Sequence, residues 1–181
     1  MCLVVLFVQC QSEGPRTKED INSEVSALKT IEEKRAYLED ILDKLQELQL
    51  EKERLQFYPE SDGEVESLNS YASELEAENL LKISAYFENF GYPSRPQLGQ
   101  YAAVAPYAVI YYSDNPEDII KEDEFRYFYG AYKFGDIPPD MFLSYLLSYY
   151  SKVKGQALSM NADIGTTENI KSVLDLLGIE Q

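Results

Sequence analysis

The stretch from Thr17 to Phe57 contains neither glycine nor proline, and this property constrains the fold more than any other feature of the sequence. Charged and apolar residues alternate along it at helical spacing, so it predicts one long helix with Thr17 as its N-cap. One seam of this helix recurs in alternating steps of three and four residues, and its members are Ile31, Lys34, Leu38, Ile41, Leu45, Leu48, Lys52 and Leu55. A seam of this kind is typical of a coiled coil, but it also suits an amphipathic helix that packs on the chain's own later helices. Both interpretations, self-association or a spacer stalk and internal packing, stay open.

A second long helix is predicted to follow a short turn that contains Pro59. The sequence Ser61-Asp62-Gly63-Glu64 has the form of a capping box, and Gly91 is placed to end the helix. The stripe expected to be buried consists of Val65, Leu68, Ala72, Leu75, Leu80, Ile83, Phe87 and Phe90. Two long helices joined by a short turn indicate an antiparallel hairpin over residues 18–90.

The second half of the chain is richer in apolar and aromatic residues and is predicted to be helical. The run from residue 98 to residue 112 could be a central helix or a buried strand, and its alanine content favours a helix that is kinked at Pro106 or starts there. Three further helices are expected, capped or opened by Asn115, Pro139 and Thr167 and closed by Gly135, Gly155 and Gly178. The fold class is therefore all-α. A long N-terminal helical hairpin is expected to pack on, or extend from, a compact aromatic-rich helical domain at residues 91–181. Residues 60–90, the second helix of the hairpin, are expected to form one globular unit with that domain.

Histidine is absent, and the two cysteines, Cys2 and Cys10, both lie in an apolar segment at the N-terminus. These absences exclude Ser-His-Asp and Cys-His nucleophilic sites, and they remove the usual zinc and copper ligands. We expect no metal and no cofactor, and no catalytic residue can be assigned. Hydrolysis by carboxylates alone stays formally open, because the chain has 32 Asp and Glu residues.

The formal net charge of the chain is −16. A surface of this sign repels the phosphate backbone of nucleic acids and anionic lipid headgroups, so nucleic acid is excluded as a partner. It suits a soluble protein first and a basic partner second.

Residues 3–10 form an apolar run that stops at Cys10 and precedes a polar linker at residues 11–17. The run is too short to span a bilayer, which takes about 20 residues. The junction resembles the end of a bacterial lipoprotein signal peptide, although no basic residue precedes the run and Gln9 stands where a small residue is usual. This resemblance implies that Cys10 is lipidated after cleavage and that the lipid alone attaches the protein to a membrane of the bacterial cell envelope. A plain cleaved signal, giving a periplasmic or secreted protein, and an uncleaved apolar N-terminus are the alternatives.

The tyrosines of the second half are the best candidates for a recognition surface, because tyrosine combines a large contact area with a polar tip. The candidate pocket or partner surface comprises Tyr107, Tyr111, Tyr112, Asp114, Tyr149 and Tyr150. The alternative is that these side chains form the rim of the core.

Several motifs between residues 80 and 165 resemble an uncharacterised family of bacterial domains. They are the Gly-aromatic-Pro turn in Phe90-Gly91-Tyr92-Pro93, the Gly-led, Ala-rich segment from Leu98-Gly99 to Tyr111-Tyr112-Ser113-Asp114, and Lys154-Gly155-Gln156. Tyr112 stands where that family has the histidine of a His-x-Asp motif, and tyrosines at 149 and 150 stand where an Asp-Arg pair is expected. If those polar residues carry chemistry in the family, the resemblance implies that this chain has lost it.

These observations predict an envelope-associated helical binding or scaffolding protein that recognises a protein or peptide partner. The alternatives are a degenerate enzyme, or one that depends on carboxylates and tyrosines, and an acidic protein that neutralises a basic effector.

Overall fold

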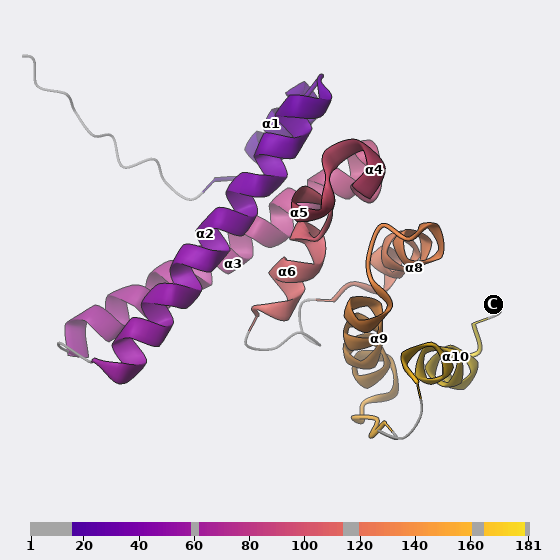
Figure 1. Ribbon diagram of the computed structural model, residues 1–181. Coiled ribbons are helices and arrows are strands. Elements are labelled where there is room, and N and C mark those ends of the chain that lie inside the picture. Colours follow the sequence, from indigo (N-terminus) through magenta and orange to yellow (C-terminus); the bar gives the residue numbers. More distant parts are fainter. Residues whose placement is uncertain (1–15, 59–61, 114–119, 161–164, 180–181) are drawn as a thin grey trace, which may run out of the picture.

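The computed structural model describes residues 16–58, 62–113, 120–160 and 165–179, and every regular element in these ranges is helical (Figure 1). The predicted all-α class is therefore confirmed. In chain order the elements are α1 (Lys18–Ala27), α2 (Ile31–Phe57), α3 (Asp62–Phe90), α4 (Arg95–Leu98), α5 (Gln100–Ala103), α6 (Ala105–Tyr111), η1 (Glu122–Glu124), α8 (Phe125–Phe134), α9 (Pro139–Lys154) and α10 (Thr166–Leu177). None of these helices is both long and apolar enough to cross a membrane.

The single helix predicted from Thr17 to Phe57 is wrong, because a break just before Thr30 divides it into α1 and α2. The Thr30 side chain accepts a hydrogen bond from the Glu33 backbone at 3.1 Å, and the Glu33 carboxylate accepts one from the Thr30 backbone at 2.8 Å. This capping box satisfies backbone donors at a helix start, so α2 needs no continuation into α1. Thr17 caps α1 as predicted and forms a second capping box with Asp20.

Helix α1 packs against α3 through two completely buried side chains, Ile21 and Val25. Arg16, which precedes α1, pairs with Glu24 on α1 and with Glu78 on α3, the latter at 3.1 Å. An apolar contact and an ionic contact therefore hold the start of the described chain on α3.

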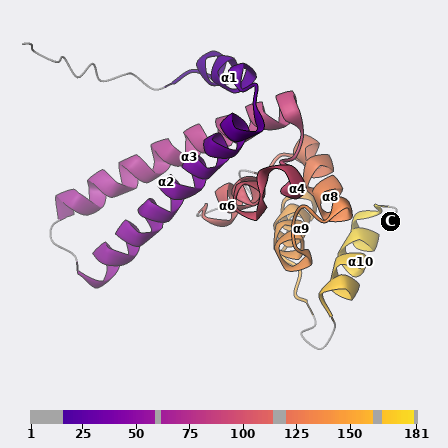
Figure 2. The same ribbon diagram turned by 45° about the horizontal axis from the view of Figure 1, so that its top comes forward.

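Helices α2 and α3 lie side by side and run in opposite directions (Figure 1, Figure 2). Most apolar members of the seam on α2 are buried against the chain's own helices: Leu38, Ile41, Leu45, Leu48 and Leu55. Ile31, at the start of the seam, is exposed instead. In the stripe expected on α3, Leu75, Ile83 and Phe87 are buried, whereas Val65 near the start of the helix is exposed.

The apolar run from residue 98 to residue 112 forms neither one helix nor a strand but parts of three short helices, α4 to α6. Gly99 separates α4 from α5 with a φ of 88°, a conformation that residues with a Cβ rarely adopt. Pro106 lies in the first turn of α6, where its missing N–H leaves no helical bond unmade. These short helices lie between the α2–α3 pair and α8 and α9 (Figure 2).

The helix predicted from Asn115 to Lys133 is not continuous: in the described part of this range, residues 120 and 121 are not helical, η1 follows, and α8 begins at Phe125. Its predicted start lies outside the described residues. Lys121 has an extended backbone, and its ammonium donates hydrogen bonds to Ser84 on α3 and, at 3.2 Å, to Glu124. This contact is made from the short non-helical stretch that precedes η1 and α8.

The ends of the later helices lie close to where the sequence predicts them. Gly135, Gly155 and Gly178 end α8, α9 and α10 as predicted, and all three have the left-handed conformation. The cap predicted for Thr167 is wrong: Thr167 lies inside α10, and Gly165 caps that helix.

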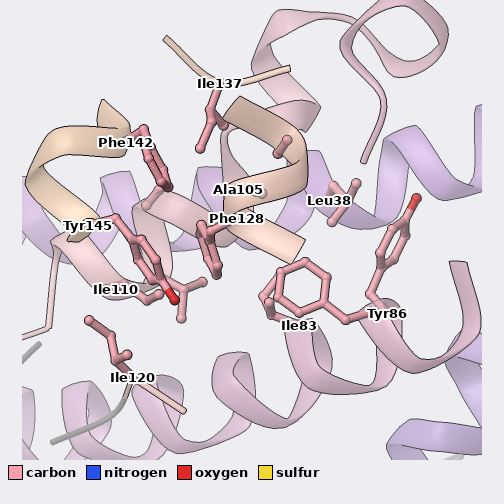
Figure 3. Packing of buried hydrophobic residues seen from close by; sticks show 14 of the residues in the cluster. Leu38, Ile83, Tyr86, Ala105, Ile110, Ile120, Phe128, Ile137, Phe142 and Tyr145 are labelled. Carbon is pink, nitrogen blue, oxygen red and sulfur yellow. The ribbon is translucent and has the colours of Figure 1, made fainter. Parts of the chain in front are cut away.

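The core is one contiguous cluster with members from α1 to α10, and aromatic rings form its centre. Figure 3 shows Phe128 of α8 beside Tyr145 of α9, whose ring centroids are 4.0 Å apart. Phe87 of α3 meets Phe128 edge-on at 5.7 Å. Ring packing thus joins the long helix α3 to α8 and α9, and α9 also carries part of the candidate site.

Candidate functional site

A hollow of about 340 Å³ lies at the junction of α2, α5, α6 and α9, and we call it the tyrosine hollow. It is lined by Leu42, Gln46, Tyr101, Val104, Tyr107, Ala108, Tyr111, Tyr112, Asp140 and Met141. The wall is thus mainly apolar and aromatic, with a few polar groups.

Helix α6 supplies the aromatic side of the hollow. Tyr107 and Tyr111 are four residues apart and therefore share one face of the helix, where their rings stack with centroids 5.5 Å apart. Tyr112 follows at the helix end and meets Tyr111 nearly at right angles, with an interplanar angle of 77°. Ala105 and Val109 are buried and hold the other side of α6 against the core.

The α2 side of the hollow is polar and acidic. The Tyr101 hydroxyl donates a hydrogen bond to Asp43 at 2.8 Å, and the Gln46 side chain also hydrogen-bonds Tyr101. Partial burial, the bond to Asp43 and the negative charges of Asp43 and Glu39 raise the pKa of Tyr101. Tyr101 therefore stays protonated and keeps its donor at neutral pH.

The α9 side adds a further carboxylate. Asp140 lies in the first turn of α9 and is exposed at the edge of the hollow. Burial raises the pKa of Tyr107; a hydrogen bond from Ser144 lowers it, but Tyr111, Asp140 and Tyr112 add to the increase. Carboxylates of both α2 and α9 thus raise the pKa values of tyrosines that line the hollow.

The structure brings only part of the predicted tyrosine surface together. Tyr107, Tyr111 and Tyr112 line one hollow, but Tyr149 and Tyr150 of α9 do not reach it. Tyr150 is buried in the core, and the Tyr149 ring packs 4.5 Å from that of Phe125. For these two tyrosines the structure favours a role in core packing. Asp114 and Cys10 lie outside the described residues.

Sequence reasoning missed Tyr101, Gln46 and Asp140 as lining residues. Tyr101 belongs to the same aromatic region, so tyrosine content alone could have included it. Gln46 and Asp140 carry no local signal of this role, because only the fold brings α2 and α9 to α6.

A second cavity, of about 10 Å³, also touches Tyr112 and reaches Asn79 of α3. Asn79 is completely buried, and its amide nitrogen and oxygen have no hydrogen-bond partner among the described residues. Ser113 also lines the cavity and donates to Glu76 at 3.0 Å. A polar space of this size suits about one water molecule and is too small for a partner's side chain.

Within the described ranges, no group of three or more His, Cys, Asp or Glu residues is arranged to hold a metal ion. Searches against protein-family models, curated proteins and solved structures found no match to this chain.

Proposed function

We propose that this protein is a binding module that recognises a segment of a protein or peptide partner in the tyrosine hollow. The observation that carries the proposal is the gathering of four tyrosines from α5, α6 and the end of α6 around one hollow. Tyrosine is enriched among the residues that dominate binding energy at protein interfaces, because it offers a large, rigid contact area and a hydroxyl group.

The exposure of these rings supports a peptide segment over an enclosed small molecule. The exposed fractions are 40% for Tyr101, 57% for Tyr111 and 37% for Tyr112. Pockets for small molecules bury about 70–90% of the ligand surface, which requires walls that close around it. Rings that stay this open suit a chain segment that lies across the surface and inserts one side chain.

Selection of short random peptides displayed on phage against the immobilised full chain tests this proposal. We expect enriched peptides whose affinity falls about tenfold in Tyr111→Ala and in Tyr112→Ala, which is the loss typical of an interface tyrosine. Phe134→Ala and Tyr71→Ala are matched controls, because each removes an exposed aromatic ring outside the hollow. These controls should bind the peptides as the wild type does.

Thermal melts of all four variants separate lost binding from lost structure. Enriched peptides that bind all variants equally would show that the hollow is not the docking surface. Failure to enrich any peptide that depends on the hollow would overturn the proposal in the same way.

The location of the protein at a bacterial envelope is part of this proposal and is supported by the sequence alone. The apolar run that stops at Cys10 is its basis. Mass spectrometry of the native protein should find Cys10 as an acylated N-terminal residue, whereas an intact Met1 would contradict the anchor.

A further inference from the structure

We infer that the tyrosine hollow takes a cationic side-chain head group, a lysine ammonium or an arginine guanidinium of the bound segment. This inference rests on the proposed binding function and specifies the chemistry of its ligand. It is carried by the orientation of the rings, by their lack of an internal cation and by the charges around them.

The rings of Tyr107, Tyr111 and Tyr112 are arranged as a corner. The first two are nearly parallel, with an interplanar angle of 27°, and the third is turned by 77° from Tyr111. A tyrosine ring carries negative charge density on its faces, so a cation within about 6 Å of a ring centroid is attracted to it. A corner of two ring planes can present more than one such face to the same head group.

Other ring faces in this chain are already covered by its own cations. The Lys34 ammonium lies 3.7 Å from the Phe90 centroid, and the Arg126 guanidinium carbon lies 4.8 Å from that of Tyr127. In the part of the chain that the structure describes, no cation–ring contact involves a tyrosine of the hollow. The corner of α6 is thus open to a cation supplied by a partner.

The charged groups around the hollow have the sign that a cation requires. Asp43 and Glu39 act on Tyr101 from α2, and Asp140 acts on Tyr107 from α9. The formal net charge of −16 gives the whole chain the same sign, which speeds the approach of a basic partner. A carboxylate-bearing side chain would meet repulsion at both edges.

Three capped amino acids serve as probes: the N-acetyl methylamides of lysine, arginine and norleucine. Norleucine has the four-carbon side chain of lysine without the ammonium, so it separates charge from apolar contact. In NMR titrations of the full chain, we expect lysine or arginine to bind about fivefold more tightly than norleucine, the effect of an exposed cation–ring contact. Comparison of the two cationic probes identifies the preferred head group.

Variants of the chain test whether the preference for cationic probes arises in the tyrosine hollow. Tyr111→Phe keeps a ring and should keep the preference for the cation, whereas Tyr111→Leu and Asp140→Asn should reduce it. Glu66→Gln removes an exposed carboxylate of α3 that does not line the hollow and should leave the preference unchanged. Added salt should weaken the cationic probes more than norleucine.

Equal affinity for lysine, arginine and norleucine would overturn the inference, and so would the absence of binding by all three at millimolar concentration. A cation preference that survives both Tyr111→Leu and Asp140→Asn would place the cation elsewhere and would also overturn it. Enriched phage peptides that depend on the hollow but contain no basic residue would contradict this inference, although they would still support the proposed binding function. Enriched peptides that do not depend on the hollow would remove the binding function itself.

Discussion

The Lys82 ammonium lies 2.8 Å from a carboxylate oxygen of Glu78, one turn earlier on α3, and the Lys82 side chain is only 4% exposed. The same oxygen accepts a hydrogen bond from Arg16 at 3.1 Å. One acidic side chain therefore neutralises a buried cation within α3 and also fastens the segment before α1 to that helix.

Replacing this acid is expected to weaken the fold. Glu78→Gln leaves the buried Lys82 ammonium without its counter-charge, and we expect the free energy of unfolding to fall by about 2 kcal/mol. Urea denaturation followed by circular dichroism measures the change. Asp40→Asn is the control, because the Asp40–Lys44 pair is exposed and its loss should cost less than about 0.5 kcal/mol. Equal losses in the two variants would contradict a special role for Glu78.

The Glu78–Lys82 pair also predicts how the free energy of unfolding depends on pH. Burial tends to raise the pKa of Glu78, but the hydrogen bonds and charges of Lys82 and Arg16 outweigh it and hold the pKa below its ordinary value of 4.5. A carboxyl group with a lowered pKa in the folded state stabilises the protein above the unfolded pKa, and this contribution is lost as the pH falls. The stabilities of the wild type and Glu78→Gln should therefore converge below about pH 4.5, as urea midpoints across a pH series would show. A difference that stays constant with pH would exclude this linkage.

Buried tyrosine hydroxyls offer a stabilising substitution. The Tyr92 hydroxyl is buried without a hydrogen-bond partner among the described residues, and burial, Asp136 and Tyr145 all raise its pKa. Tyr92→Phe removes the unpaired polar group and keeps the ring, so the free energy of unfolding should rise by about 1 kcal/mol. Tyr101→Phe removes a hydroxyl that donates to Asp43, so it should not be stabilising. Thermal and urea denaturation of both variants provide the comparison; a loss of stability in Tyr92→Phe would show that its hydroxyl is satisfied in solution.

Two threonines near helix starts, Thr30 and Thr167, should respond differently to alanine. Thr30 caps α2 through its side chain, so Thr30→Ala should cost about 1 kcal/mol of the free energy of unfolding. Thr167 lies inside α10 and is exposed, so Thr167→Ala should change that free energy by less than about 0.5 kcal/mol. Melting temperatures of the two variants in one buffer would rank them, and the reverse order would mean that the helix starts are misplaced.

The features that sequence reasoning predicted well depend on a few neighbouring residues. Gly135, Gly155 and Gly178 end helices because glycine adopts positive φ without steric cost, and this holds whatever surrounds them. The break before Thr30 was predictable in principle, since Thr30 and Glu33 form a capping box. The absence of glycine and proline between Thr17 and Phe57 indicates a continuous helix, and this longer-range pattern conflicts with the local cap.

The composition of the tyrosine hollow could not be predicted from the sequence, because it depends on contacts between distant segments. Tyr101 meets Asp43 across 58 positions of the sequence. In the sequence Tyr149 is equivalent to the tyrosines of α6, whereas in the fold its ring packs against Phe125. Helical periodicity shows which side chains share a face, but the packing of other helices decides whether that face is open.

The break between α1 and α2 also affects how the protein responds to a pulling force on its N-terminal end. Because Thr30 caps α2 independently, α1 can be pulled away without unwinding α2. Tension applied to the N-terminal end would first load the pairs of Arg16 and the contacts of Ile21 and Val25 with α3. Helix α1 is therefore expected to detach before the helices that form the tyrosine hollow.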